Sequence, residues 1–461
     1  TTEIYTLSLH DALPILTETN GTCTDTRTVA VRYAEQPTVT APAAQDLCGT
    51  LSTTVTATGF TYSIAPNVNW HTYQWTYVSG PDNTPTFGSA TALSTTIAVD
   101  LYGDYVFRIT ETNGTCSNNK TVAVRFAEQP TVTAPAAQDL CGVLTTTLTA
   151  TGHIYQAGST NWHTYQWAYV SGPDNTPTFG TPTAISTTAL VDLYGDYVFR
   201  ITETNGTCTN SKTVAVRYAQ QPTVTAPVAQ SLCNTKTTTL TATGFTYQAG
   251  STNWHTYQWA YVSGPDATPT FSTPTAISTT ALVDYYGDYV FSITETNGTC
   301  TDTRTVAVRY AEQPTVTAPG AQNLCGTLST TVTATGFSYS AAPNDNWHTY
   351  QWTYVSGPDN TPTFGSATAL STTIAVDLYG DYVFRITETN GACSDNKTVA
   401  IRFAQQPTVT APAAQDLCGT KTTTLTATGF TYQVGSTNWH TYQWAYVSGP
   451  DATPTFSTPT A

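Results

Sequence analysis

The chain has 461 residues, of which 30 are Asp or Glu and 15 are Lys or Arg, so its formal net charge is -15. An acidic surface with few Lys residues argues against nucleic acid or an anionic membrane as a partner. No apolar run approaches the ~20 residues needed to cross a bilayer, and the many Thr, Tyr and Trp residues favour β-sheet.

The sequence consists of nearly identical repeats of 92 or 93 residues. The segment Asn-Trp-His-Thr-Tyr-Gln-Trp begins at Asn69 and returns at Asn161, Asn253, Asn346 and Asn438. A catalytic site needs one asymmetric pocket, whereas near-identical modules in series supply length or many equivalent contacts. The repetition therefore favours a structural or adhesive role.

The two ends do not match complete repeats. Residues 1–15 resemble the translation of a sequencing adapter, so we interpret them as a non-native segment and not as a targeting sequence. The remaining sequence divides into the C-terminal end of a repeat at 16–36, complete repeats at 37–128, 129–220, 221–312 and 313–405, and a truncated repeat at 406–461. We expect a metagenomic fragment of a longer natural protein.

Repeat 37–128 shows the pattern of a β-protein. Residues 53–58 alternate small apolar residues with Thr, and residues 72–78 place aromatic side chains on one face, which predicts two short strands. Tyr105, Phe107 and Ile109 share a face of a later strand, and Asn113-Gly114 is a favoured hairpin turn dipeptide. No sustained 3.6-residue period occurs, so helix should be nearly absent.

Two motifs in this repeat carry a family resemblance. Trp75 on the third predicted strand and Gly103-Asp104-Tyr105 at the start of the sixth resemble the core Trp and tyrosine corner of immunoglobulin-like sandwiches. From Thr17 onward the chain resembles the bacterial Ig-like modules of secreted cell-surface adhesins and fibre proteins. The resemblance implies an all-β tandem array of antiparallel sandwiches, with core tryptophans at Trp75, Trp167, Trp259, Trp352 and Trp444.

The ten cysteines form two series of five, one at the front of each repeat and one near its end. Even numbers at fixed spacing, without Cys-x-x-Cys pairs, indicate disulfides in an oxidising compartment and do not favour zinc. We therefore expect an extracellular or cell-surface protein.

The resemblance also bears on the pairing of these cysteines. Antibody-type domains bridge two core positions that correspond here to about Val55 and to Phe107, and the cysteines of this chain lie elsewhere. Cys48 precedes the first position and Cys116 follows the second, on strands that run the same way, so the two fall at opposite ends of a sandwich. Pairing across neighbouring repeats would instead join Cys48 to Cys208, Cys141 to Cys300 and Cys233 to Cys393. A short extra strand or a folded-back first strand would allow pairing within one repeat.

The repeated Asn-Trp-His motif offers a candidate binding surface. An aromatic ring at the end of a sandwich stacks on sugar rings or on a neighbouring protomer, and the His adds a polar group. The alternative is that each Trp closes the end of its own sandwich. The candidates are Trp70, His71, Trp162, His163, Trp254, His255, Trp347, His348, Trp439 and His440.

Two further groups of residues are candidates for modification or metal binding. Sequons in or near the predicted hairpin turn are candidate glycosylation sites, namely Asn20, Asn113, Asn119, Asn205, Asn297 and Asn396, whereas Ala392 removes the sequon at Asn390. Asp82, Asp100 and Asp104 offer carboxylates for calcium, but their Gly-Pro-Asp and Gly-Asp settings favour turn roles. We expect no other cofactor.

No nucleophile, base and orienting acid occur together, so the sequence predicts a non-enzyme. The leading hypothesis is an extracellular fibre, filament or stalk that self-associates or contacts neighbouring protomers. The rivals are a multivalent array that binds surface glycans and the spacer region of a larger secreted enzyme.

Overall fold

The computed structural model describes residues 15–63 and 70–460. The predicted non-native segment 1–15 therefore lies outside the described residues, apart from Ile15. The chain divides into two compact units, and each is described on its own. The first runs to Gln221 and includes Tyr247–Trp254 and Asn297–Cys300, and the second contains the remaining residues. Every regular element in the described ranges is a β-strand, and no helix there is long and apolar enough to cross a membrane.

Repeat 37–128 forms two sheets in the first unit. Its strands are β3 (Gln45–Cys48), β4 (Ser52–Thr56), β5 (His71–Ser79), β6 (Thr86–Phe87), β7 (Ser94–Ala98), β8 (Gly103–Asn113) and β9 (Cys116–Ala127). One sheet has the order β3-β9-β8-β5 and the other the order β4-β7-β6. Only β3 is parallel to its neighbour, β9.

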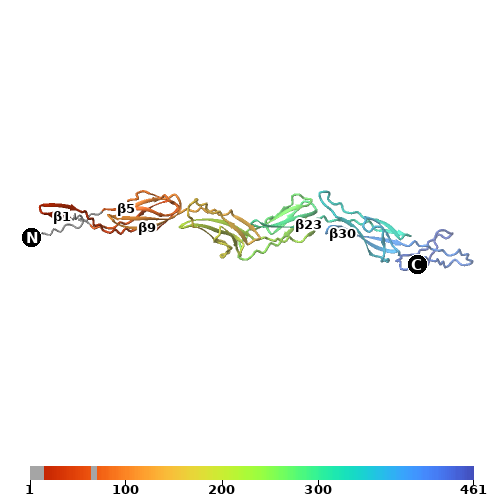
Figure 1. The fold of residues 1–461 in the computed structure, drawn as a ribbon. Coiled ribbons are helices and arrows are strands. Elements are labelled where there is room, and N and C mark those ends of the chain that lie inside the picture. Colours follow the sequence, from red (N-terminus) through yellow and green to blue (C-terminus); the bar gives the residue numbers. More distant parts are fainter. Residues whose placement is uncertain (1–14, 64–69, 461) are drawn as a thin grey trace. The chain divides into compact units, whose positions relative to one another are not determined.

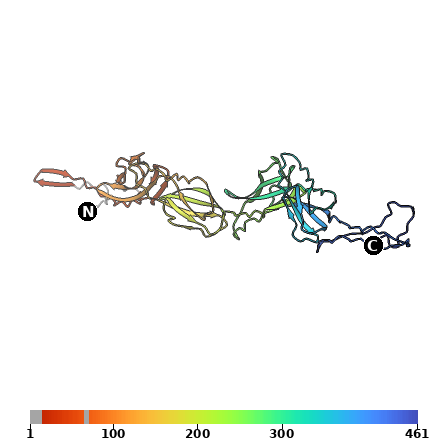
Figure 2. The same ribbon diagram turned by 90° about the vertical axis from the view of Figure 1, so that its right-hand side faces the viewer.

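These strand orders define an immunoglobulin-like sandwich, as the sequence predicts. The antiparallel orders β5-β8-β9 and β4-β7-β6 correspond to the CFG and BED sheets of that fold, and β3 adds a parallel edge strand. Figure 1 labels β5 and β9 of this repeat. Figure 2 shows the strand layers from a second direction.

The other complete repeats have the same seven strands in the same order. In repeat 129–220 they are β10 (Gln138–Cys141), β11 (Thr145–Thr149), β12 (His163–Ser171), β13 (Thr178–Phe179), β14 (Ser186–Leu190), β15 (Gly195–Asn205) and β16 (Cys208–Ala219). In repeat 221–312 they are β17 (Gln230–Cys233), β18 (Thr237–Thr241), β19 (His255–Ser263), β20 (Thr270–Phe271), β21 (Ser278–Leu282), β22 (Gly287–Asn297) and β23 (Cys300–Ala311). In repeat 313–405 they are β24 (Gln322–Cys325), β25 (Ser329–Thr333), β26 (His348–Ser356), β27 (Thr363–Phe364), β28 (Ser371–Ala375), β29 (Gly380–Asn390) and β30 (Cys393–Ala404).

Each sandwich encloses its own apolar core. In repeat 37–128, Trp75 is 1% exposed and packs with Phe107, which is fully buried. The hydroxyl of Tyr105 donates to the carbonyl of Leu101 at 2.7 Å, which is the predicted tyrosine corner. The equivalent tryptophans Trp167, Trp259 and Trp352 are equally buried, so the predicted core positions are confirmed in the four complete repeats.

The hairpin turn lies one residue later than the sequence indicates. Asn113 ends β8 and faces Cys116 across the ladder, so the two central turn residues are Gly114 and Thr115. Gly114 has a φ of 61°, which fits the first central position of a type II′ turn. Asn113 is therefore a strand residue with a fully buried side chain, and not part of the exposed turn.

The partial repeats at the two ends contain few of the strands of a complete repeat. Strands β1 (Ile15–Asn20) and β2 (Cys23–Thr28) form an exposed hairpin. Residues 406–460 make two isolated bridges and no named strand. The predicted burial of Trp444 is wrong, since this side chain is only partly buried, because the sequence holds no counterpart of β15 and β16 to cover it.

Candidate functional site: the joints between repeats

The two cysteine series lie at opposite ends of each sandwich. Cys48 ends β3 beside Ala127 at the end of β9, whereas Cys116 begins β9. A strand rises ~3.3 Å per residue, so these two positions are separated by roughly 36 Å along β9. A disulfide spans less than ~7 Å between Cα atoms. The structure does contain a short extra strand, β3, of the kind that could have allowed pairing within one repeat. This strand, however, places Cys48 at the opposite end of the sandwich from Cys116.

Three disulfides instead connect a front cysteine to the end cysteine of the following repeat. The bonds are Cys48–Cys208, Cys141–Cys300 and Cys233–Cys393, with Cα–Cα distances of 5.3, 5.3 and 5.1 Å. These are the three pairs expected from the sequence. Cys23, Cys116, Cys325 and Cys418 are free thiols in the described residues. We name each joint by the two residues at which the chain crosses from one repeat to the next, so these disulfides span the 128/129, 220/221 and 312/313 joints.

A stack of three side chains also connects the two repeats at the 128/129 joint. Arg125 on β9 donates from Nε and Nη2 to the two carboxylate oxygens of Asp104 on β8, at 2.7 and 3.1 Å. These hydrogen bonds raise the pKa of Arg125, so the guanidinium stays charged. Its Cζ lies 4.3 Å from the ring centroid of Trp162 in the next repeat, a cation–π contact.

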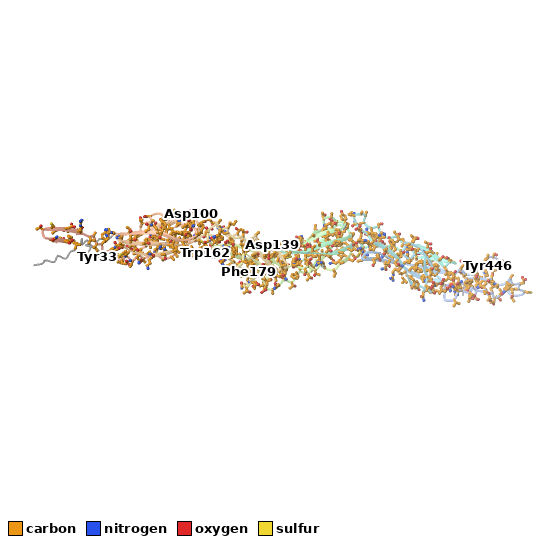
Figure 3. The ribbon with its side chains drawn as sticks, viewed as in Figure 1. Tyr33, Asp100, Asp139, Trp162, Phe179 and Tyr446 are labelled. Carbon is orange, nitrogen blue, oxygen red and sulfur yellow. A yellow bond between two sulfur atoms is a disulfide. The ribbon has the colours of Figure 1, made fainter. Side chains whose placement is uncertain are left out.

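The same Arg–Trp contact recurs at every joint in the described residues. The other pairs are Arg32–Trp70, Arg217–Trp254, Arg309–Trp347 and Arg402–Trp439, at 4.0 to 4.3 Å. Each ring lies at the end of its sandwich and contacts the preceding repeat, so one of its two faces is covered by the Arg. Binding of a sugar or of a neighbouring protomer through these rings stays a prediction. Figure 3 labels Trp162 together with Asp100, which lies at the same joint.

The neighbouring histidines are exposed and stack on a tyrosine of their own repeat. The rings of His71 and Tyr62 are 4.9 Å apart and nearly parallel. Tyr62 in turn donates to the buried carboxylate of Glu111 at 2.9 Å. A role for the histidines in binding stays a prediction. Equivalent stacks occur at His163, His348 and His440.

A buried asparagine ties each joint that precedes a complete repeat to the backbone on both sides. The Oδ1 atom of Asn205 accepts from the backbone N–H of Trp162 at 2.8 Å, and its Nδ2 donates to the carbonyl of Glu128 at 2.9 Å. Asn390, which is not in a sequon, makes the same two bonds with Trp347 and Glu312. Asparagine at this position therefore serves the joint.

This burial corrects the prediction of glycosylation for half of the sequons. The side chains of Asn113, Asn205 and Asn297 are fully buried, so a glycan there would require the joint to open. Asn20, Asn119 and Asn396 are exposed, and glycosylation of these three stays a prediction.

Backbone contacts complete each joint. At 128/129 the N–H of Thr160 donates to the carbonyl of Tyr102 at 2.9 Å, and the N–H of Tyr102 donates to the Ser159 hydroxyl at 2.9 Å. Repeat 313–405 has a loop one residue longer at this place. Its Asp345 and Asn344 nevertheless make the equivalent bonds to Tyr286. The loop sequence varies while the joint contacts are reproduced.

The candidate calcium aspartates have structural partners. The carboxylate of Asp82 accepts from the Thr84 N–H and hydroxyl and from the Asp100 N–H, at 2.8 to 3.1 Å. Burial alone would raise the pKa of Asp82, but the hydrogen bonds from Asp100 and Thr84 outweigh it and lower the pKa below its usual value. Asp104 is held by Arg125. In the residues that the structure describes, no three His, Cys, Asp or Glu side chains are arranged to hold a metal ion.

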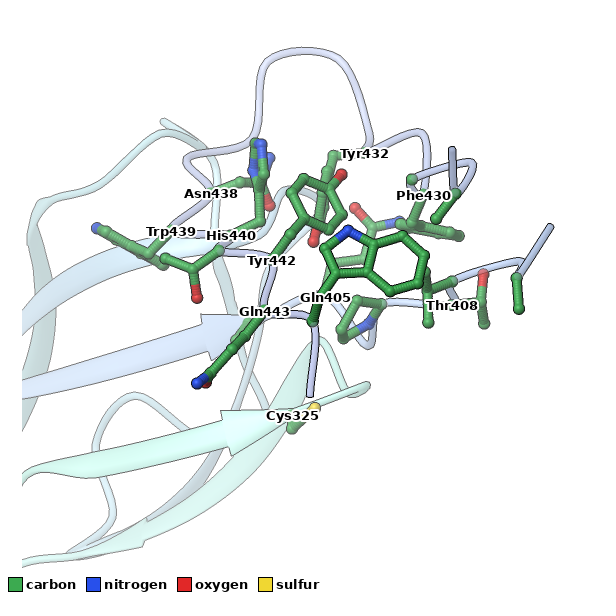
Figure 4. A pocket seen from close by; sticks show the side chains of 18 of the residues that line it. Cys325, Gln405, Thr408, Phe430, Tyr432, Asn438, Trp439, His440, Tyr442 and Gln443 are labelled. Atoms are coloured by element: carbon green, nitrogen blue, oxygen red, sulfur yellow. The ribbon is translucent and has the colours of Figure 1, made fainter. Parts of the chain in front are cut away.

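The pocket drawn in Figure 4 lies in the truncated last repeat. Its lining includes Leu425, Ala427 and Trp444, which correspond to the core residues Leu148, Ala150 and Trp167. This hollow is therefore the uncovered core of an incomplete sandwich, and it is not a candidate ligand site.

No family model matches the chain, and no curated protein matches it. Among solved structures, an I-band fragment of titin is 14% identical, with 61% of this chain and 99% of that chain covered and a TM-score of 0.35. Extracellular domains 3–5 of Drosophila OTK are 12% identical, with coverage of 59% and 95% and a TM-score of 0.30. The N-terminal eight Ig domains of Down Syndrome Cell Adhesion Molecule are 10% identical, with coverage of 84% and 52% and a TM-score of 0.37. Sequence identities and TM-scores this low support no argument about function.

Proposed function

We propose that the chain is part of a secreted, non-enzymatic structural protein, in which Ig-like repeats are held by locked joints in a surface fibre, filament or stalk. The observation that carries this proposal is the disulfide that spans each joint between complete repeats. Disulfides persist in oxidising compartments, which supports an extracellular location.

Repetition of the joint supports a structural role over a ligand-binding one. Each of the three joints between complete repeats combines a disulfide with an Arg–Trp stack and a buried asparagine, so the complete repeats are held to one another through the same contacts. A multivalent glycan-binding array would instead present its aromatic rings to solvent, and here one face of each ring is covered. Self-association or contact with neighbouring protomers, as in an adhesive fibre, belongs to the same proposal.

Electron microscopy of the full chain tests the proposal. The free thiols are first blocked with an alkylating agent, and the angle between consecutive repeats is measured with the disulfides intact and after their reduction. Intact joints should give a narrow distribution of angles, and reduction should widen it. An equally wide distribution in both states would contradict locked joints.

Binding to a panel of polysaccharides tests the rival directly. The comparison is with a variant in which Trp70, Trp162, Trp254, Trp347 and Trp439 are all replaced by Ala. The proposal predicts that the two chains do not differ in polysaccharide binding, whereas binding by the wild-type chain that this variant loses would favour the glycan-binding array.

A further inference from the structure

We propose that the disulfides and the strands next to them form continuous covalent paths that carry tension along the chain and bypass most residues of each sandwich. The inference deepens the proposed structural function, because tension matters only in a fibre or stalk. It follows from the connectivity of the cysteines.

Each path is built from short segments of chain that we call struts. A strut begins at an end cysteine, follows the last strand of one repeat, crosses the joint and ends at the front cysteine of the next repeat. The strut from Cys208 to Cys233 contains β16 and β17 and covers 25 positions of sequence. The other struts run from Cys23 to Cys48, from Cys116 to Cys141, from Cys300 to Cys325 and from Cys393 to Cys418.

Disulfides connect alternate struts end to end. Cys48–Cys208 joins the first strut to the third, and Cys233–Cys393 joins the third to the fifth. A pull on the two ends of the chain therefore passes from Cys48 to Cys208, along one strut, and from Cys233 to Cys393. Residues 49–207 and 234–392, which form most of each sandwich, lie outside this path. The Cys141–Cys300 bond joins the second strut to the fourth and belongs to a separate path.

The struts have little slack, because their strands are already extended. A β-strand rises ~3.3 Å per residue, against a maximum of ~3.6 Å for a fully stretched chain. Neighbouring struts also lie side by side within one sheet. Gln138–Cys141 of one strut pairs in parallel with Val216–Ala219 of the next. Tension along the strut from Cys208 to Cys233 therefore acts parallel to the strands of this ladder.

Single-molecule force spectroscopy of the full chain tests the path. Handles are attached enzymatically at both chain ends, and the final extension is measured at high force. With all disulfides intact, roughly 140 residues carry the load, which corresponds to roughly 500 Å. Reduction should release the remaining residues and lengthen the chain by roughly 1100 Å.

Two double variants separate the path from a general effect of disulfide loss. Cys48→Ser with Cys208→Ser breaks the path, and the shortest remaining route runs through Cys141–Cys300 and Cys233–Cys393, so the final extension should increase by about 135 residues, or roughly 470 Å. Cys141→Ser with Cys300→Ser removes a bond of the same kind from the other path, and the final extension should not change. Equal lengthening in both variants, or a wild-type extension near that of the reduced chain, would overturn the proposal. Neither outcome depends on the joint angles seen by microscopy, so the two proposals fail separately.

Discussion

Trp162 and Trp167 are five residues apart in one repeated motif, yet they belong to different parts of the molecule. Trp167 is 1% exposed and lies in the core of its own sandwich. Trp162 lies under the guanidinium of Arg125 from the preceding repeat. The motif therefore serves two purposes, since its second Trp stabilises the repeat and its first Trp contacts the neighbouring repeat. Changes at the two positions should differ in size and in what they disturb.

Replacement of a core tryptophan should have the largest effect on stability. Trp167→Ala should lower the stability of repeat 129–220 by ~3–5 kcal/mol, because truncation of a buried Trp removes apolar contacts and leaves a cavity. Hydrogen exchange of the amides in β15 measures this repeat separately from the others. A loss below ~1 kcal/mol would contradict a core position.

Removal of a joint disulfide should have the next largest effect. Cys141→Ser with Cys300→Ser should cost ~2–4 kcal/mol, because the bond limits the freedom of the unfolded chain. Denaturant unfolding of the oxidised protein measures the loss. The wild-type chain under reducing conditions is the control, and an unchanged midpoint in the variant would show that the bond contributes nothing.

The buried asparagine at a joint should contribute somewhat less to stability than the joint disulfide. Asn205→Ala leaves the N–H of Trp162 and the carbonyl of Glu128 without their side-chain partner, at a cost of ~1–3 kcal/mol. The exposed Asn119→Ala is a matched control and should stay within ~0.5 kcal/mol of wild type in the same unfolding assay. Similar losses in both variants would remove the special role of Asn205.

The tyrosine corner should make the stability of the fold depend on pH in the alkaline range. Burial raises the pKa of Tyr197 to about 12, so its neutral form is favoured in the fold. The resulting stability is present below the usual tyrosine pKa of ~10 and is lost as the pH rises from there towards 12. Tyr197→Phe should cost about 1 kcal/mol at pH 7 and should make the alkaline loss smaller. An unchanged alkaline loss in thermal unfolding at pH 9 to 12 would assign it to other groups.

The smallest effect on stability is expected from the joint tryptophan. Trp254→Ala should cost ~1 kcal/mol or less, the usual size of a cation–π contact that is not fully desolvated. The same variant should widen the distribution of angles at the 220/221 joint once the disulfides are reduced. A loss above ~3 kcal/mol would place Trp254 in a core and end the distinction between the two tryptophans.

The sequence predicts the sandwich well because its signals are local. Alternation around Trp75 and Tyr105 assigns both residues to the core, and the structure confirms both. The turn is misplaced because Asn-Gly is a strong turn signal, whereas the pairing of Asn113 with Cys116 moves the turn by one residue.

The joint is harder to predict because its partners are far apart in the sequence. Asn205 and Glu128 are 77 residues apart, and no periodic pattern connects them. Asp104, Arg125 and Trp162 are also far apart in the sequence, and no local motif connects them, although all three residue types recur in every complete repeat. The cysteines are the exception, because the resemblance to Ig-like sandwiches places the two series at opposite ends of a repeat and favours the neighbouring repeat as the partner.

Mass spectrometry of a non-reduced digest tests the central claim, that each joint is locked by a disulfide between neighbouring repeats. The free thiols are alkylated before digestion to prevent exchange. The structure predicts a linked peptide pair that contains Cys141 and Cys300. A pair that joins Cys141 to Cys208, within one repeat, would contradict the joints and the tension-bearing paths together.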